Sequence, residues 1–362
     1  MRRNRASDVR CLAHCLQGHF PVHVDWDAVV ALANESLTIT NLASAVRSHS
    51  QPDTIDPQVR DYLSEIYARN EQRNARFYDQ LGQAATCLNG VGVAPVLMKG
   101  AAVLHARRSE TLGARILVDL DLMVQPDEMF KSIDALKGIG YCVKIASAAG
   151  SWPGDARLHL PTVLARPGDV GSIDLQCRAK GPALFGDIGW VIERSTSADI
   201  GGGRVHAPSI EAQIVYLLLH DQFQDGDYWR GLIDLRHLAD ILYFMNTDSA
   251  VNLADIRDLF KRGYLRNAVD TQLLTIRTLF RTAADQEISF SLKSSLQLRR
   301  RLMQLNQPAL RRTFTIMTLL SEIADYPQWD RFGGEPSLDV RIQAKRFREL
   351  RRVFRSKALG KL

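Results

Sequence analysis

The sequence contains no hydrophobic run that approaches the roughly 18 apolar residues a membrane-spanning helix needs. It also lacks internal repeats and low-complexity segments, so its pattern is that of ordinary globular domains. Its five cysteines are odd in number and irregularly spaced, and no apolar segment of a secretory signal precedes them. We therefore expect a cytoplasmic protein with reduced thiols and no disulfide framework.

Neither sign of charge dominates the body of the chain. The formal net charge is +6, but residues 341–362 hold nine Lys/Arg and one Glu, which is +8 and leaves −2 for the remainder. Phe347, Leu350 and Phe354 recur in this tail at spacings of three and four, which predicts an amphipathic helix with one docked face. Contact with nucleic acid or an acidic membrane is the alternative interpretation of the tail.

The 362 residues, 46% of them hydrophobic, allow a substantial core and two or three domains. The chain divides into three regions by its pattern of apolar residues. These are a helical N-terminal region at 1–90, a block of short strands and helices at 91–208, and a C-terminal helical region with the basic tail at 209–362. We therefore predict an α+β fold with a mixed sheet flanked by helices.

Local signals place the main elements. Asp56-Pro57 predicts the start of a long helix that ends at Gly90 or Gly92, and Ser209 predicts the N-cap of another helix. Residues 201–209 are expected to form a loop with a short strand. Apolar runs predict four strands, at residues 93–98, 116–124, 141–146 and 170–178.

Two carboxylates interrupt an otherwise apolar strand, ILVDLDLMV. Asp119 and Asp121 point to the same side of it, because side chains in a strand alternate with a period of two. Carboxylates near a core are unfavourable unless they are paired, and Mg²⁺ is a cation that prefers such oxygen ligands, often together with substrate phosphates. The alternative is that one Asp merely ends the strand or caps the next helix.

A third acid and a neighbouring turn extend this hypothesis. Asp174 also stands in an apolar strand, and three acids on adjacent strands suit a two-metal site for in-line displacement at phosphorus. Lys99-Gly100 is expected to be a turn between a strand and a helix, where backbone N–H groups and the Lys side chain meet phosphates. Arg115, just upstream of the pair, is a second cation for that role.

The order of these motifs resembles that of a known group of proteins. VLMKG, GARILVDLDLMV and GSIDLQ are similar to motifs of the DNA polymerase β-like nucleotidyltransferase superfamily, and more closely to its uncharacterised bacterial nucleotidyltransferase family. The resemblance covers roughly residues 24–245. Further segments that match in order are Gly140-Tyr141, His159-Leu160-Pro161, Asp174-Leu175, Leu218-Leu219-His220 and the segment 235–240.

This resemblance implies a polymerase β-like sheet and transfer of a nucleoside monophosphate from a nucleoside triphosphate to a hydroxyl or similar acceptor, with release of pyrophosphate. By the same resemblance, Asp119 and Asp121 would hold two Mg²⁺ ions on the triphosphate. Asp174 would complete one metal site and favour deprotonation of the acceptor hydroxyl.

The resemblance also implies the residues that bind the nucleotide, namely Lys99, Gly100, Arg115 and His220. For His220, a hydrogen-bonded position in a helix core is the alternative. Cys11, His14 and Cys15 share one helix face and suggest a zinc site, although buried cysteines usually serve as small apolar residues.

The near-neutral body favours a small molecule, sugar or peptide as the acceptor over nucleic acid. Two other functions stay open: an RNA-modifying nucleotidyltransferase guided by the basic C-terminal helix, and a nucleotide-binding regulatory protein without turnover. The acceptor, the preferred triphosphate and the oligomeric state are not specified by the sequence.

Overall fold

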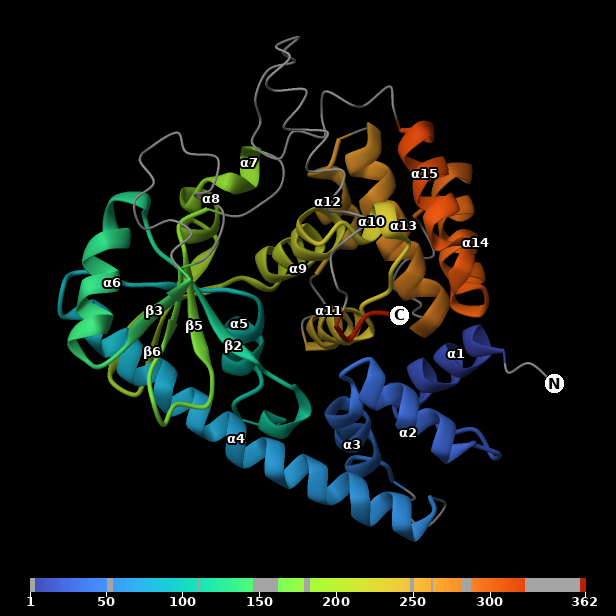
Figure 1. Ribbon diagram of the computed structural model, residues 1–362, viewed down its shortest axis with the longest axis horizontal. Coiled ribbons are helices and arrows are strands. Elements are labelled where there is room, and N and C mark those ends of the chain that lie inside the picture. Colours follow the sequence, from blue (N-terminus) through green and yellow to red (C-terminus); the bar gives the residue numbers. More distant parts are fainter. Residues whose placement is uncertain are drawn as a thin grey trace. The chain divides into compact units, whose positions relative to one another are not determined.

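The computed structural model describes residues 4–50, 55–109, 111–145, 162–178, 183–247, 251–261, 263–280, 288–322 and 359–362. The chain forms two compact units. We call residues 64–216 the sheet unit, and residues 1–63 together with 217–362 the helical unit. Figure 1 labels most of the helices and several of the strands.

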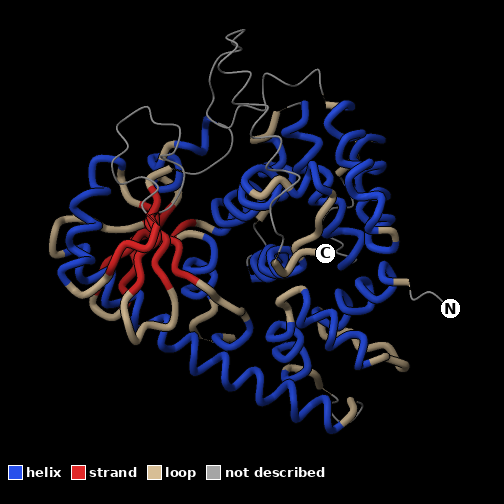
Figure 2. The backbone as a smooth tube through the Cα atoms, viewed as in Figure 1, coloured by secondary structure: helices blue, strands red, loops and turns tan. Residues whose placement is uncertain are grey.

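A single mixed sheet of seven strands, in the order β3-β4-β5-β2-β1-β7-β6, forms the centre of the sheet unit (Figure 2). The pairs β2–β5 and β1–β7 are parallel, and the other neighbouring strands are antiparallel. The two strands that carry the predicted acids, β2 and β5, are therefore direct neighbours. The strands are β1 Val96–Leu97, β2 Asp119–Met123, β3 Cys142–Ile145, β4 Thr162–Ala165, β5 Ser172–Gln176, β6 Ser195–Ile200 and β7 Gly203–Pro208.

The long helix α4, Pro57–Asn89, begins where the sequence predicts. The Asp56 carboxylate accepts a hydrogen bond from the Gln58 N–H at 2.8 Å, which satisfies a free donor of the first turn. From residue 64 onward α4 supplies one apolar face to the core of the sheet unit, where Phe77, Leu81 and Leu88 are fully buried with side chains of the strands. The other helices of this unit are α5 Lys99–Ala106, α6 Met129–Gly138, α7 Ala183–Gly186, α8 Ile188–Ile192 and most of α9 Ile210–Leu218.

Two strands were not expected from the sequence. The first is β6. It forms a hairpin with β7, the short strand of the segment 201–209, and the register of this hairpin pairs Ser197 with His206. β6 reads STSADI and has little apolar alternation, so backbone pairing with β7 rather than a hydrophobic pattern defines it. β4 was missed as well, and it pairs antiparallel with β5.

The helical unit consists of helices packed around α1 and α13, with contacts of α1 to α2, α3, α13 and α14. An aspartate caps the start of α2: Asp25 accepts from the Ala28 N–H at 3.0 Å. The helices are α1 Arg5–Leu16, α2 Trp26–Glu35, α3 Ile39–Arg47, α10 Asp227–Arg230, α11 Leu235–Thr247, α12 Leu253–Asp258, α13 Gly263–Phe280, α14 Leu292–Asn306 and α15 Arg311–Ser321, with a π-helical turn, η4 Leu219–Gln224.

The predicted α+β class with a mixed sheet and flanking helices is confirmed. None of the helices in the described ranges is long and apolar enough to cross a membrane. Residues 341–358 of the predicted tail helix, and His159, lie outside the described residues. The last four residues are described, and Leu359-Gly360 form a turn.

Candidate active site

The register between β2 and β5 brings two of the predicted acids together. The strands are parallel, and Asp121 pairs with Asp174 while Asp119 pairs with Ser172. Leu120 and Leu122, on the opposite face of β2, are completely buried in the core. Because alternate side chains share a face, Asp119, Asp121 and Asp174 form one group on the other side of the sheet.

Lys99 is brought to this group by strand β1, the neighbour of β2 on the side away from β5. β1 runs antiparallel to β2, and just past their pairing the Met98 N–H donates to the Asp121 carbonyl oxygen at 3.0 Å. Lys99 follows at once, and its Nζ lies 2.7 Å from Oδ1 of Asp121, with both side chains largely buried. The sequence separates these two residues, but the antiparallel pairing places them side by side.

The expected turn at Lys99-Gly100 is instead the first turn of α5, which begins at Lys99. Lys99 has a φ of +43°, a left-handed conformation that residues with a side chain adopt rarely, and often at functional sites. At Gly100 a Cβ would come within 2.9 Å of Cδ2 of Leu117, so glycine lets the helix start close to the segment before β2. Met98 provides no side-chain cap for the first N–H groups of α5.

The electrostatics of the group reflect crowded carboxylates. Burial and the nearby charges of Asp119 and Asp121 raise the pKa of Asp174 to about 7, against the opposing effect of Lys99. Burial alone would lower the pKa of Lys99, but the carboxylates of Asp121, Asp119 and Asp174 outweigh it and leave that pKa raised. Lys99 is thus a cation that interacts with all three acids.

Arg115 is buried, and its guanidinium donates to the carbonyl oxygen of Ile116. It is not among the main charges that shift the pKa of Lys99 or Asp174. A role for Arg115 at the triphosphate therefore stays a prediction.

Two asparagines that sequence reasoning missed hold the segment leading into β2. On α4, Nδ2 of Asn70 donates to the carbonyl oxygens of Gly113 and Arg115 at 2.8 and 2.9 Å. Nδ2 of Asn74 donates to those of Leu112 and Arg115 at 2.7 and 2.8 Å. Asn74 is fully buried, and an Asn pair four residues apart on the inward side of a helix was the available signal.

The residues of the aspartate group fit a magnesium site in their chemistry. They offer only carboxylate oxygens, the ligand atoms that Mg²⁺ prefers. Burial and the charges of Asp119 and Asp121 raise the pKa of Asp174, and a bound cation would offset both effects. In this structure their oxygens are not gathered as closely as the ligand atoms of a single metal site, and Lys99 binds Asp121.

The structure places His220 in a different group, within the helical unit. Among the described His, Cys, Asp and Glu residues, only His220, Asp221 and His237 have ligand atoms all within 4.8 Å of one another. Nδ1 of His237 lies 2.6 Å from Oδ1 of Asp221, and Nδ1 of His220 lies 3.3 Å from the same oxygen. Assignment of His220 to the nucleotide stays a prediction.

The cysteines of α1 do not form such a group in the described part of the chain. Burial raises the pKa of Cys15 to about 12 and also raises that of Cys11. Because zinc binds the thiolate form, this surrounding favours the interpretation of these cysteines as apolar core residues.

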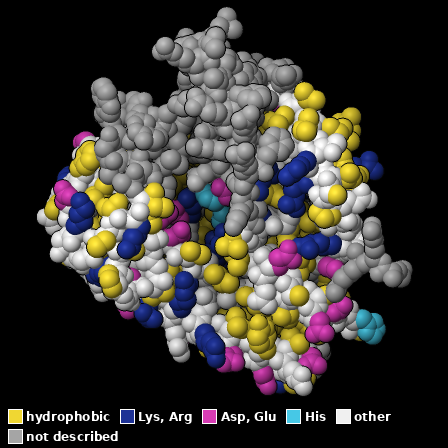
Figure 3. Space-filling model, viewed as in Figure 1, with side chains coloured by type: hydrophobic (Ala, Val, Ile, Leu, Met, Phe, Trp, Pro, Cys, Tyr) yellow, Lys and Arg dark blue, Asp and Glu magenta, His cyan; other side chains and the backbone are white. Residues whose placement is uncertain are grey.

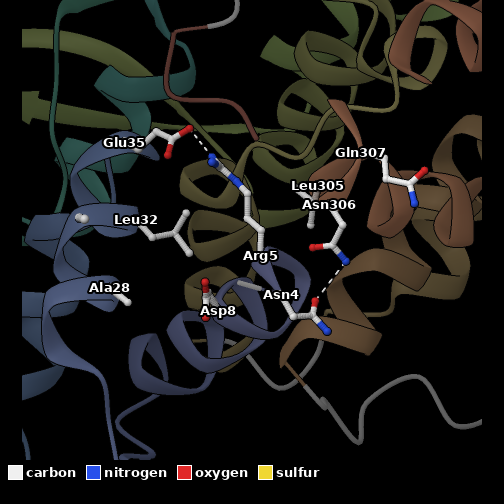
Figure 4. A pocket seen from close by; sticks show the side chains of 10 residues that line it. Asn4, Arg5, Asp8, Ala28, Leu32, Glu35, Leu305, Asn306 and Gln307 are labelled. Atoms are coloured by element: carbon white, nitrogen blue, oxygen red, sulfur yellow. Dashed lines mark hydrogen bonds and ion pairs between the residues drawn. The ribbon is translucent and has the colours of Figure 1, made fainter. Parts of the chain in front are cut away.

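A cavity of about 660 Å³ lies in the helical unit and contains none of the predicted site residues. Figure 4 shows Arg5 of α1 directed toward Glu35 of α2, with which it forms an ion pair. The lining residues are Asn4, Arg5, Asp8, Ala28, Ala31, Leu32, Glu35, Leu305, Asn306 and Gln307.

Comparison with known proteins supports the resemblance noted from the motifs. No curated protein and no solved structure gives a significant match to the chain. A model of one family, described as uncharacterised nucleotidyltransferase, matches residues 23–281, which is well over half of the chain and includes Lys99 and all three acids. The chain therefore belongs to this uncharacterised nucleotidyltransferase family, whose general activity is nucleotidyl transfer.

Proposed function

We propose that the protein moves a nucleoside monophosphate from a nucleoside triphosphate to a hydroxyl acceptor, in a Mg²⁺-dependent reaction that releases pyrophosphate. The observation that carries this proposal is the shared register position of Asp121 and Asp174, with Asp119 on the same face and Lys99 2.7 Å from Asp121. Family membership supplies the reaction class, and these four residues supply the chemistry.

Asp119, Asp121 and Asp174 are the proposed metal ligands. Bound Mg²⁺ would polarise the phosphorus and offset the charge that develops on the triphosphate. Crowded carboxylates attract a divalent cation, and the charges of Asp119 and Asp121 contribute to the raised pKa of Asp174. This attraction supports a site that is completed by divalent ions and a nucleotide.

Asp174 is the proposed acceptor of the proton from the attacking hydroxyl. Its pKa of about 7 belongs to the metal-free group, and Mg²⁺ on this carboxylate would lower that pKa and keep the side chain ionised, as a proton acceptor must be. Ser172 lies beside it, with its Oγ 3.4 Å from Oδ1 of Asp174, and helps to orient the carboxylate.

Lys99, Gly100 and Arg115 are the proposed triphosphate contacts. Lys99 is fixed by an uncommon backbone angle and by the start of α5, so its ammonium is held in place before a nucleotide binds. Gly100 lets the uncapped N-terminus of α5 lie next to β2, and the free N–H groups there favour phosphate oxygens.

A small molecule, sugar or peptide is the proposed acceptor. Apart from the tail, the chain carries a net charge of −2. On the face shown in Figure 3, the described Lys and Arg side chains are mixed with Asp and Glu and do not form one continuous basic area. A duplex would need such an area to offset its phosphates.

The test is incubation of the purified protein with each of the four α-labelled triphosphates, Mg²⁺ and fractionated small-molecule extract, followed by identification of the labelled product. We expect one triphosphate to give a labelled adduct and equimolar pyrophosphate, and Asp121→Asn to give none. Triphosphate binding with no adduct and no pyrophosphate from any fraction would contradict the proposal and favour the regulatory alternative. Label appearing only in RNA would contradict the proposed acceptor class.

A further inference from the structure

Helices α14 and α15 form an antiparallel pair in the helical unit. Nε2 of Gln297 donates to Oγ1 of Thr318 at 3.2 Å, and Nζ of Lys293 donates to the carbonyl oxygen of Ser321 at 3.0 Å. The 3₁₀ turn η5, Pro308–Leu310, connects the two helices. These contacts place the first half of α14 beside the second half of α15.

One face of α14 exposes large apolar side chains to solvent. Leu292 is 77% exposed, and Leu296 and Met303 are exposed as well. Together with Arg299 they occupy positions i, i+4, i+7 and i+11, which lie on one side of a helix. The other side of α14 packs into the core through its buried residues Ser294, Gln297, Leu298, Arg301, Gln304 and Leu305.

The neighbouring part of α15 continues this apolar surface. Ile316, Met317 and Leu320 are all at least half exposed. Leu320 precedes Ser321 and Met317 precedes Thr318, so both lie at the level of the first half of α14. Figure 3 shows hydrophobic side chains at the surface over α15, at the upper right of the view. We call these side chains the apolar ridge: Leu292, Leu296, Met303, Ile316, Met317 and Leu320.

The apolar ridge lies on a segment with charge of only one sign. Residues 291–321 contain six Lys/Arg and no Asp or Glu. Lys293 pairs with the buried Glu322, just past the segment, at 2.7 Å. Arg299 and Arg312 are exposed, and neither forms an ion pair within the described part of the chain. The ridge therefore combines exposed aliphatic side chains with positive charges that no described carboxylate offsets.

Single exposed apolar residues are common, but a group of six on two adjacent helices, bordered by charged residues, is typical of an interaction surface. We propose that the apolar ridge docks on the surface of a bilayer that contains anionic phospholipids. The aliphatic side chains would enter the boundary with the acyl chains, and Arg299 and Arg312 would contact the phosphates. The inference does not depend on the proposed nucleotidyl transfer.

The combination of charge and side-chain type favours this partner over two others. An anionic bilayer presents negative headgroups directly above hydrocarbon, and therefore matches both features of the ridge. A second copy of the chain would match the apolar side chains but would place two basic faces against each other. A nucleic acid would match the charge, but the ridge contains no aromatic side chain on which bases could stack.

The test is co-sedimentation of the full-length chain with sucrose-loaded vesicles, which measures its partition coefficient. We expect binding to vesicles of equal parts phosphatidylcholine and phosphatidylglycerol to be at least about tenfold stronger than binding to phosphatidylcholine alone. Added salt should weaken binding to the anionic vesicles, because it screens the attraction of the headgroups.

Two matched pairs of variants locate the contact. Leu296→Ser combined with Leu320→Ser should lower the partition coefficient at least about tenfold, whereas Val22→Ser, at an exposed position of the same unit, should not change it. Arg299→Gln should weaken binding to the anionic vesicles about fivefold, and Arg10→Gln, an exposed position of α1, should leave it unchanged.

Melting temperatures show whether these variants fold. If the double leucine variant does not, Met317→Gln, at a 57% exposed position of the ridge, gives the same readout. The proposal is overturned if the wild type does not bind anionic vesicles, or if folded ridge variants bind as it does. It is equally overturned if replacement of the three tail arginines alone abolishes binding, or if the ridge variants abolish a concentration-dependent dimer instead, which would make the ridge an interface between copies.

Discussion

Asp121 and Asp174 occupy the same register position on the neighbouring parallel strands β2 and β5, with their side chains on one face of the sheet. Burial raises the pKa of Asp174 to about 7, and the nearby charges of Asp119 and Asp121 add to this shift. Such crowding opposes folding unless a cation balances it.

Asp119→Asn should abolish Mg²⁺-dependent transfer without loss of stability. Asp119 is only partly buried at the start of β2, and removing its charge relieves the repulsion on Asp174. We expect turnover to fall at least about 100-fold, beyond the 10- to 100-fold effect typical of groups that merely orient a ligand. The melting temperature should be equal or higher. The control is Asp134→Asn, which changes an exposed acid of α6. If Asp119→Asn simply fails to fold, Asp119 has a structural role and not a catalytic one.

Lys99→Gln should weaken triphosphate binding far more than monophosphate binding, because Lys99 is assigned to the outer phosphates. One charge-assisted contact corresponds to about a 10- to 100-fold change in Kd. Isothermal titration with both nucleotides measures the difference, and Lys131→Gln, a half-exposed lysine of the same unit, is the control. An equal loss of affinity for both nucleotides would mean that Lys99 does not contact the outer phosphates.

The stability of the metal-free protein should decrease as the pH rises from about 4 to about 7. The pKa of Asp174 is about 7 in the folded protein and near its ordinary value of 3.8 when unfolded, so between these values the folded state binds more protons. Ionisation then costs the folded state free energy, and above pH 7 this contribution is constant. Melting curves in EDTA should show a smaller decrease for Asp174→Asn than for the wild type. Identical slopes would mean that the Asp174 carboxyl titrates normally.

Asn74→Ala should lower the free energy of unfolding by about 1–3 kcal/mol, because the carbonyl oxygens of Leu112 and Arg115 lose a buried donor. Since that segment leads into β2, we also expect slower transfer at saturating Mg²⁺. Chemical denaturation measures the first effect and kcat the second. Gln72→Ala, at an exposed position on the same helix, should change neither. A stable Asn74→Ala variant would show that the segment is held by other contacts.

Replacement of Arg351, Arg352 and Arg355 by Gln should leave transfer to a small acceptor intact, because such an acceptor has no run of phosphates for a basic tail to contact. Assays of product formation and melting temperature compare the triple variant with the wild type. Loss of activity on an RNA acceptor with unchanged folding would favour the RNA-modifying alternative, in which the tail is an electrostatic arm.

The sequence alone determined the local parts of this site. The period-two pattern of ILVDLDLMV placed Asp119 and Asp121 on one face, and β2 has them there. Asp56-Pro57 determined the start of α4 because capping involves only residues a few positions apart. The ordered motifs identified the family, since they combine these local patterns along most of the chain.

Only the tertiary structure decided which of these parts meet. Nothing in a strand's own pattern specifies that Asp121 stands opposite Asp174, or that β1 brings Lys99 to Asp121, because register and strand order are set by packing between distant segments. The same holds for Lys361, which the sequence presents as one more charge of a basic tail. In the folded chain it lies buried against Asp227, 134 residues away, because burying an ammonium is favourable only where the fold gathers carboxylates around it.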